Sequence, residues 1–143
     1  MLISQILKDK GDLVFTVTPS ETVATAARLL NERRVGAMVV VDADGSVVGI
    51  ISERDVVRIL AEEGDGSLSR AISECMTSDV VFAQPNETVD ALLGRMTDRR
   101  VRHLPVVVNG RLAGIVSIGD LVKHKISEVV AEAENLKSYI SAG

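Results

Sequence analysis

The sequence predicts an α/β (α+β) protein made of two repeated β-α-β-β-α units, and three observations carry this prediction. Segment 19–35 recurs 66 residues later as 85–101, and such an internal repeat indicates duplicated structure. A β-branched run that ends in a hydroxyl residue and enters a helical pattern occurs twice, at 49–55 and 114–120. Hydrophobic residues make up 46% of the 143 residues and aromatic residues only 2%, so the composition suits an aliphatic core.

The first half reads as a short helix, a strand, a longer helix and a hairpin that leads into another helix. Ser20 is a favourable N-cap for the longer helix, and Val23, Ala26, Ala27 and Leu30 fall on one face of it. We expect the short helix at 2–7, the strands at 14–17, 37–41 and 47–51, and the start of the last helix at Ser52.

The second half repeats this order. Asn109-Gly110 predicts a two-residue hairpin turn, and the segment 62–67 has the composition of a linker between the halves. We expect a short helix at 68–76 and strands at 80–83, 104–108 and 112–116. The domain prediction is a first unit at 1–66, a second unit at 67–126 and a C-terminal helical extension at 127–143.

The two units are expected to depend on each other. A three-stranded sheet in a unit of about 60 residues has too small a core to be stable alone. The copies should therefore pack sheet to sheet about a pseudo-twofold axis. The strand-to-helix junctions would then open onto clefts between the halves, where ligand pockets form.

The final helix departs from the repeat because it carries an apolar stripe beyond the expected domain. We predict a homodimer through this stripe, and the alternative is that the tail folds back on its own domain. The solvent-facing side of the helix can carry Glu128, Glu132 and Lys137. The stripe consists of Val122, Ile126, Val129, Ala133, Leu136 and Ile140.

Composition excludes several classes of function. A net charge of −4 and scarce aromatic residues argue against nucleic acid as a partner. No stretch is apolar enough to span a bilayer and the N-terminus lacks a secretory signal, so we expect a cytoplasmic protein with no membrane partner. The single cysteine, Cys75, is predicted to be a partly buried structural thiol rather than a reactive one. His103 and His124 lie on different elements, so no metal site is expected.

The two junctions carry the candidate chemistry. Ser52 and Asp55 in the first, and Ser117 and Asp120 in the second, stand where a helix begins. A helix N-terminus attracts phosphate, and an aspartate there can accept hydrogen bonds from ribose hydroxyls. The alternative is a capping box, in which these side chains satisfy backbone N–H groups and no ligand binds.

The repeated motifs resemble those of a known family. Gly-Ile-Ile-Ser-Glu-Arg-Asp at 49–55, Gly-Ile-Val-Ser-Ile-Gly-Asp at 114–120 and Arg-His-Leu-Pro-Val-Val at 102–107 are similar to the motifs of a tandem pair of cystathionine-β-synthase (CBS) domains, called a Bateman module. The resemblance runs from Leu2 to about Lys125. It implies two CBS motifs, a regulatory role and pairing of modules into disc-like dimers.

The resemblance also implies an adenosine-containing ligand, such as AMP, ADP, ATP, NAD(H) or S-adenosylmethionine. It assigns ribose binding to Asp55 and Asp120, and phosphate contacts to Ser52, Ser117, Arg102 and His103. It places Ala37, Met38, Leu104 and Pro105 beside the adenine, and Thr16, Thr18 and Ala83 along the pocket.

The basic groups are distributed unequally between the two motifs. The first half has Gly36 and Ala37 where the second has Arg102 and His103, whereas Arg54 stands at the position of Gly119. This difference suits one composite phosphate pocket or two pockets of unequal affinity. Alternatively, Arg54 pairs with a neighbouring carboxylate and Arg102 is a solvated strand end.

The leading hypothesis is a regulatory module without catalysis of its own, which senses energy or redox state through an adenosine nucleotide and modulates an unknown partner protein. No Ser-His-Asp, Cys-His or paired-carboxylate constellation emerges. The alternative is a ligand-independent dimerising scaffold. A weaker third hypothesis is an enzyme that uses Asp55 or Asp120.

Overall fold

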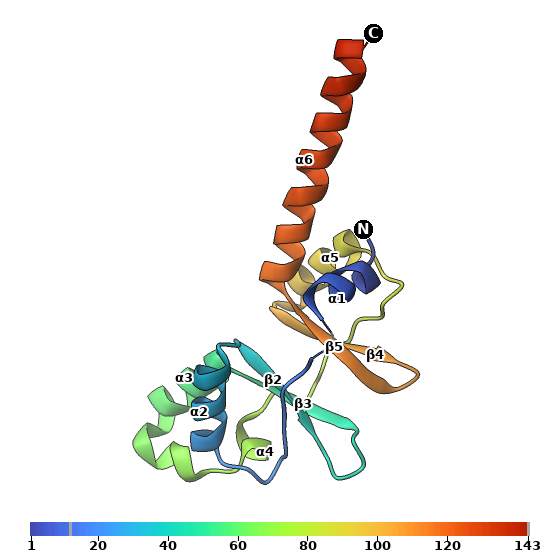
Figure 1. Ribbon diagram of the computed structural model, residues 1–143. Coiled ribbons are helices and arrows are strands. Elements are labelled where there is room, and N and C mark those ends of the chain that lie inside the picture. Colours follow the sequence, from blue (N-terminus) through green and yellow to red (C-terminus); the bar gives the residue numbers. More distant parts are fainter. Residues whose placement is uncertain (12, 143) are drawn as a thin grey trace. The chain divides into compact units, whose positions relative to one another are not determined.

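A computed structural model describes residues 1–11 and 13–142 (Figure 1). The elements follow the predicted order in the first half and, apart from the strand expected at 80–83, in the second, where a 3-10 helix, η1, precedes the short helix. Their bounds are α1 (Ile3–Lys10), β1 (Thr16–Val17), α2 (Val23–Arg33), β2 (Ala37–Val41), β3 (Val47–Ser52), α3 (Glu53–Glu63), η1 (Gly64–Ser69), α4 (Ile72–Cys75), α5 (Val89–Arg99), β4 (His103–Val108), β5 (Arg111–Ser117) and α6 (Ile118–Ala142).

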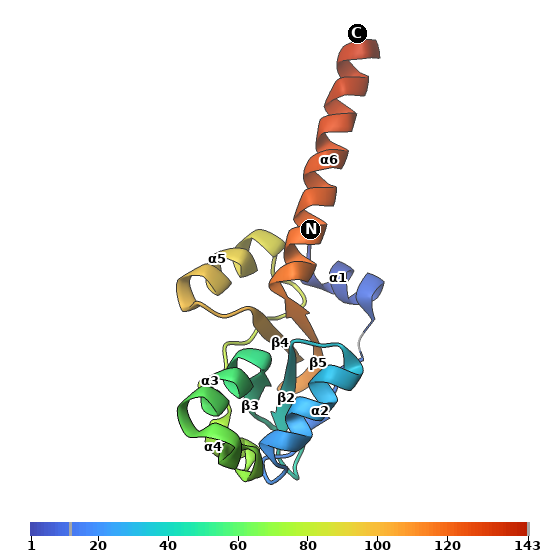
Figure 2. The ribbon, with the colours of Figure 1, turned by 90° about the vertical axis from the view of Figure 1, so that its left-hand side faces the viewer.

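The first sheet has the order β1-β2-β3. Strands β1 and β2 pair in parallel, with α2 as the crossover between them, and Thr16 is aligned with Val39. Strands β2 and β3 form an antiparallel hairpin in which Ala37 lies opposite Ser52. Helices α2 and α3 lie side by side on one face of this hairpin (Figure 2). The predicted crossover and hairpin of the first half are confirmed.

The second sheet pairs β4 with β5. Asn109 and Gly110 both have positive φ, 52° and 78°, as the predicted two-residue turn requires. The predicted strand at 80–83 is wrong, because within the described residues only Ala83 of this segment forms a bridge, parallel to Val106. Pro85 follows two residues later and has no N–H with which to extend a ladder.

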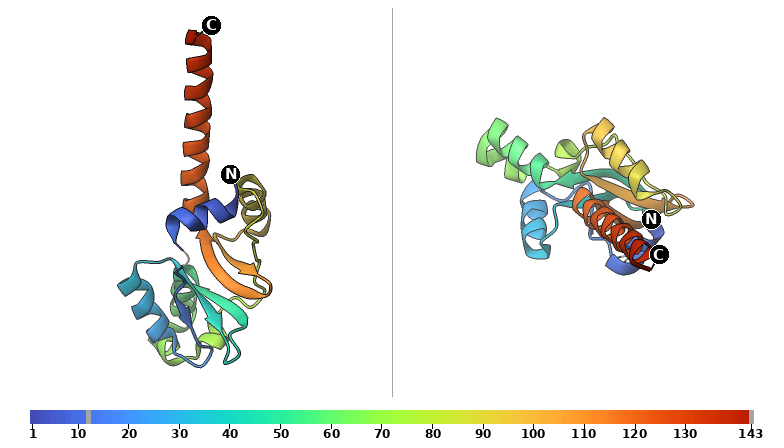
Figure 3. Two further views of the ribbon diagram at one scale, coloured as in Figure 1. Left: turned by 45° about the vertical axis from the view of Figure 1, so that its right-hand side comes forward. Right: turned by 90° about the horizontal axis from the view of Figure 1, so that it is seen from above.

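The short helix before each repeat docks on the other repeat. The Ile3 amide of α1 donates to the Glu87 carbonyl at 2.9 Å. In the first repeat, the Ile72 amide of α4 donates in the same way to the Glu21 carbonyl at 2.7 Å. Helices α1 and α5 each pack against the base of α6 and lie on different sides of it (Figures 2 and 3).

These contacts divide the chain into two compact units. One unit joins α1 with Phe82–Val108 and the chain from Gly114 onward, and the other consists of Leu13–Val81 and Asn109–Ala113. The contacts therefore group the short helices differently from the sequence repeat, whose boundary at 66/67 stays a prediction. The sheet-to-sheet packing of the halves also stays a prediction.

Threonines, rather than Ser20, cap the two central helices. The Thr22 hydroxyl oxygen accepts a hydrogen bond from the Thr25 amide at 3.2 Å, and Thr88 caps α5 in the same way. Ser20 was expected to cap α2, but it lies in a turn in which the Thr18 amide donates to Glu21 Oε2 at 2.8 Å. The helix therefore begins later than predicted.

The predicted linker is ordered structure within one unit. Residues Gly64–Ser69 form η1, and the Ser67 hydroxyl donates to the Gly64 carbonyl at 2.6 Å. Ser67 is buried, with an exposed fraction of 1%. The glycines of this segment thus serve a tight helical turn.

Aliphatic side chains build the core, as composition predicts. Cys75 is buried in it, and burial raises the pKa of its thiol, which confirms a structural cysteine. In the unit that starts at Leu13, the core contains Val17, Val23, Ala26, Leu30, Met38, Val40, Ile51, Ile59, Ile72 and Cys75. In the other unit, the buried apolar residues include Ile3, Ile6, Ala83, Val89, Leu92, Met96, Leu104, Val106, Val116 and Leu121.

Helix α6 is the longest element and extends past α1 and α5 of its own unit (Figures 1 and 3). Residues 131–141 are exposed along its outer part. Within the described residues, no helix has the length and apolar character needed to cross a membrane.

Candidate functional site

The first junction is a complete capping box at the point where β3 becomes α3. The Ser52 amide donates to Asp55 Oδ2 at 2.9 Å, and the Asp55 amide donates to Ser52 Oγ at 3.3 Å. Asp55 is buried, with an exposed fraction of 8%. The capping alternative is therefore confirmed as the local structure of this junction.

Arg58 closes the first junction from the next turn of α3. Its Nη2 lies 3.1 Å from Asp55 Oδ1 and 3.5 Å from the Cys75 carbonyl oxygen. The sequence analysis overlooked Arg58, although its spacing from Asp55 is one at which helical side chains meet. Arg54 is exposed and forms no ion pair among the described residues. The alternative that Arg54 pairs with Asp55 is thus wrong, because Arg58 takes that position.

The second junction has the same capping box where β5 becomes α6. The Ser117 amide donates to Asp120 Oδ2 at 2.8 Å, and the Asp120 amide donates to Ser117 Oγ at 3.1 Å. Space lies beside this helix start, since among the described residues a Cβ at Gly119 would meet only Ser117 Oγ, at the ordinary contact distance of 3.6 Å.

Lys10, from α1, completes the second junction. Its ammonium nitrogen lies 2.6 Å from Asp120 Oδ2 and donates to the Ile115 carbonyl at 2.8 Å. Sequence reasoning missed Lys10 because periodicity gives no sign that α1 docks on the second repeat. The same docking brings Asp9 to within 3.7 Å of His124 Nε2.

These contacts determine the charge of Asp120. Burial alone would raise the pKa of its carboxyl group, but hydrogen bonds from Lys10 and Ser117 outweigh burial and lower that pKa. Asp120 is therefore ionised at neutral pH and is an acceptor only.

The two aspartates differ in how many of their oxygens are used. Among the described residues, the hydrogen bonds to the carboxylate of Asp120 all fall on Oδ2. The carboxylate of Asp55 accepts hydrogen bonds on both Oδ1 and Oδ2. Since a carboxylate oxygen has two acceptor sites, Asp120 Oδ1 is left for a hydroxyl donor. The second junction is thus better prepared for a ligand.

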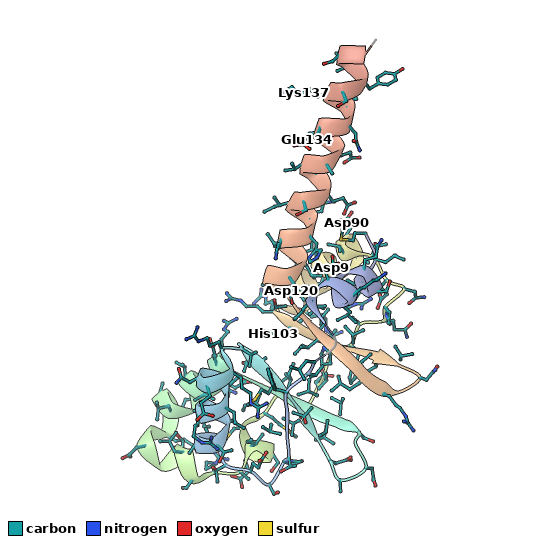
Figure 4. The ribbon with its side chains drawn as sticks, viewed as in Figure 1. Asp9, Asp90, His103, Asp120, Glu134 and Lys137 are labelled. Atoms are coloured by element: carbon teal, nitrogen blue, oxygen red, sulfur yellow. The ribbon has the colours of Figure 1, made fainter. Side chains whose placement is uncertain are left out.

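The start of the inner strand lies beside the junction in each unit. The Ile118 amide donates to the Arg102 carbonyl at 2.8 Å, and the Glu53 amide donates to the Gly36 carbonyl at 3.0 Å. Arg102 is exposed and His103 is half-buried. Figure 4 shows His103 and Asp120 near the lower end of α6. The structure therefore brings the basic pair of the second half next to Ser117 and Asp120.

The predicted adenine neighbours lie on the strands that lead from these junctions. Met38 and Leu104 are essentially fully buried, and Ala37 and Pro105 are buried as well. Their contact with adenine stays a prediction.

The residues predicted to line the pocket lie on the first-strand segments. Thr16 and Thr18 are exposed, whereas Ala83 is buried against β4, where its amide donates to the Pro105 carbonyl at 2.9 Å. Their contact with a ligand also stays a prediction.

Comparison with known proteins identifies the repeat. The family model described as the CBS domain matches residues 11–62 and 72–127. The chain belongs to the CBS domain family. Both predicted CBS motifs and the predicted fold class are confirmed.

CBS domain-containing proteins resemble most of the chain. A mitochondrial CBS domain-containing protein of Arabidopsis thaliana is 34% identical over 99% of this chain and 72% of its own length. The crystal structure of a CBS-domain containing protein from Agrobacterium tumefaciens is 48% identical, with a TM-score of 0.85, and covers 87% of this chain and 92% of that chain.

A third similar structure contains ligands. The CBS domain pair of protein MJ0100, in complex with 5'-methylthioadenosine and S-adenosyl-L-methionine, is 27% identical with a TM-score of 0.80. The match covers 90% of this chain and 98% of that one. A CBS pair of this fold thus binds adenosine-containing molecules.

Proposed function

We propose that this chain is a regulatory module that binds an adenosine-containing ligand, has no catalysis of its own and modulates a partner protein. The candidate ligands are AMP, ADP, ATP, NAD(H), S-adenosylmethionine and 5'-methylthioadenosine. The observation that carries the proposal is the second junction, where an ionised Asp120 keeps Oδ1 available at the start of α6.

The geometry suggests how the second junction holds such a ligand. A ribose hydroxyl donates to Asp120 Oδ1, in the same way that acidic residues accept hydrogen bonds from ribose in other nucleotide sites. A phosphate is attracted by the N-terminus of α6, with Ser117 as an additional donor. Arg102, His103 and Lys10 supply positive or donor groups around the same junction.

The first junction is the weaker site in this proposal. Asp55 is buried and both of its oxygens accept hydrogen bonds within the protein, so a ribose hydroxyl would have to share Oδ1 with Arg58. Arg54 adds an exposed cation there. Of the two possibilities raised by the unequal basic groups, we therefore favour two pockets of different affinity.

Regulation follows if the ligand binds one arrangement of the two units more tightly than another, since only differential affinity shifts an equilibrium. An adenine nucleotide would report energy state, and NAD(H) would report redox state. We further propose that the module is a homodimer, because the stripe predicted to mediate pairing is exposed on α6. We also propose that it works in the cytoplasm, as the sequence prediction has it.

Thermal unfolding of the full chain tests the proposal. The purified protein is heated with AMP, ATP, NADH, S-adenosylmethionine or 5'-methylthioadenosine, and with GTP as a control. A ligand at a hundred times its dissociation constant adds about 2.7 kcal/mol to the free energy of unfolding. We expect at least one adenosine compound to raise the midpoint of thermal unfolding and GTP to leave it unchanged.

The competing function is a ligand-independent scaffold. It is favoured by one observation: both Ser-x-x-Asp sequences form complete capping boxes. If no adenosine compound raises the midpoint, the scaffold replaces the sensor, and the two aspartates are helix caps only.

A further inference from the structure

Helix α6 carries a heptad pattern on a face that its own unit leaves exposed. Alternating spacings of four and three residues place Val122, Val129 and Leu136 at d positions and Ile126, Ala133 and Ile140 at a positions. The five large side chains of this stripe are between 43% and 69% exposed. A sustained stripe of this kind forms the seam of a coiled coil.

The stripe is not the face that holds α6 to its unit. That face contains Leu121, which is fully buried, and His124, whose Nε2 lies 3.7 Å from Asp9 Oδ2. It also contains Lys125, whose Nζ lies 2.9 Å from Asp90 Oδ1, and Glu128, whose Oε2 lies 3.5 Å from the N-terminal amine. At 3.6 residues per turn, the stripe lies roughly 110° round the helix from it. Beyond Glu128 the unit-facing side continues as Glu132 and Asn135, which offer nothing apolar for folding back.

We propose that α6 pairs with the α6 of a second copy in a parallel, two-stranded coiled coil. This inference rests on the homodimer proposed above, specifies the surface that makes it, and does not depend on a ligand. Ile126 and Ile140 at a positions with Leu136 at d are a combination that favours two strands.

The charges beside the stripe select the parallel orientation. In a parallel pair, a g side chain faces the e side chain of the partner's next heptad. Glu132 is at g and Lys137 at e, so each Glu132 faces the partner's Lys137, twice by symmetry. In an antiparallel pair with aligned apolar layers, Glu132 meets the partner's Glu132 and Lys123 meets the partner's Lys137. Both of those contacts are repulsive.

Matched substitutions of the full chain test the surface. Ala133→Asp places a charge in the seam, whereas Ala131→Asp makes the same change two residues away, on the outer face. Sedimentation and light scattering measure the dimer, and circular dichroism checks that each variant folds. We expect Ala133→Asp to weaken dimerisation on the order of a hundredfold, because a buried unpaired charge costs several kcal/mol, and Ala131→Asp to leave it unchanged.

Charge reversal tests the orientation. Lys137→Glu should weaken a parallel dimer by roughly tenfold, since it turns two attractions into repulsions, and adding Glu132→Lys should restore it. An antiparallel dimer would instead be strengthened by Lys137→Glu, through the partner's Lys123. As a direct check, Ala133→Cys should oxidise to a covalent dimer, because facing a positions suit a disulfide, and Ala131→Cys should not; Cys75 is buried.

The outcomes separate this inference from the broader proposal. A dimer that persists in Ala133→Asp and in a Leu136→Asp variant overturns the α6 seam but leaves a homodimer through another surface. A monomeric wild-type chain overturns both the seam and the homodimer. Neither result bears on adenosine binding, which the thermal test measures independently.

Discussion

At the scale of single residues, Asp120 joins three roles that are usually separate. It caps α6, it pairs with Lys10 from α1, and in the proposed function it binds the ligand through its other oxygen. Its counterpart Asp55 has its partner Arg58 on its own helix. Two junctions with the same motif therefore differ because different cations reach them.

The ionisation of Asp120 predicts how stability depends on pH. Its pKa in the folded protein is lowered below the unfolded value of about 3.9. A lowered pKa contributes stability above the unfolded value, and that contribution is lost as pH falls through the folded pKa. We expect wild type to be more stable than Asp120→Asn at neutral pH and the difference to shrink below about pH 4.

Urea unfolding of both proteins at several pH values measures this difference. Glu87 also has a lowered pKa, because Arg95 bonds to it, and so it contributes to the pH dependence of both proteins equally. The difference in unfolding free energy between wild type and Asp120→Asn could instead stay constant from neutral to acidic pH. That result would show that the pair with Lys10 does not stabilise the ionised form of Asp120.

At the scale of elements, close backbone approach explains the glycine of each junction motif. A Cβ at Gly49 would overlap Met76 Sδ and lie 3.0 Å from the Thr77 carbonyl oxygen, and one at Gly114 would lie 2.7 Å from Leu7 Cδ2. These contacts indicate that the glycines of β3 and β5 permit close packing at the two junctions.

Alanine substitution of these glycines tests the packing. Gly49→Ala should cost about 1–3 kcal/mol, because backbone atoms must shift, and Gly114→Ala should cost less, since the end of a leucine side chain can move. The control is Gly94→Ala in α5, where nothing lies within 4 Å of the new Cβ. That change should stabilise the protein by roughly 0.5–1 kcal/mol. Equal effects at Gly49 and Gly94, read from denaturant midpoints, would contradict the crowding.

Helix α1 is predicted to be an integral part of its unit. Ile6 is fully buried, whereas Leu2, on the same segment, is 40% exposed. Ile6→Ala should therefore cost about 2–5 kcal/mol of unfolding free energy, and Leu2→Ala much less. If both substitutions change the urea midpoint equally little, the docking of α1 on the second repeat is wrong.

The sequence predicted regular elements well and their tertiary partners poorly. Residues Ala37–Val41 form the strand that continuous apolar character indicated, and the turn at Asn109-Gly110 forms as its residue types require. The strand prediction for 80–83 was wrong because strand pairing depends on which residues reach β4, and local composition does not show this. The Ser-x-x-Asp junctions were evident from local spacing.

The role of Lys10 was not evident from the sequence, because Lys10 is 110 residues from Asp120 in the chain. Nothing local in the sequence signals that contact. The cations that distinguish the two junctions, Lys10 and Arg58, are therefore what the structure adds to the candidate site.

At the scale of the whole molecule, the chain is a CBS pair with two unequal junctions and a helix that projects from one unit. We propose that the ligand binds at the junctions and that two copies pair through the outer part of α6. Since Asp120 lies in the first turn of α6, the proposed ligand site and the proposed seam share one helix. Each can be altered without the other, because Ala133 lies more than three turns beyond Asp120.

The most direct test of the central claim is an isothermal titration with whichever adenosine compound gives the largest thermal shift. Wild type is compared with Asp120→Asn and with the matched variant Asp55→Asn. We expect Asp120→Asn to weaken the tighter binding step by roughly tenfold or more, because a hydrogen bond to a charged group contributes about 1.5–3 kcal/mol. Asp55→Asn should leave that step nearly unchanged. Equal losses in both variants, or a loss only in Asp55→Asn, would contradict the assignment of the principal site to the second junction.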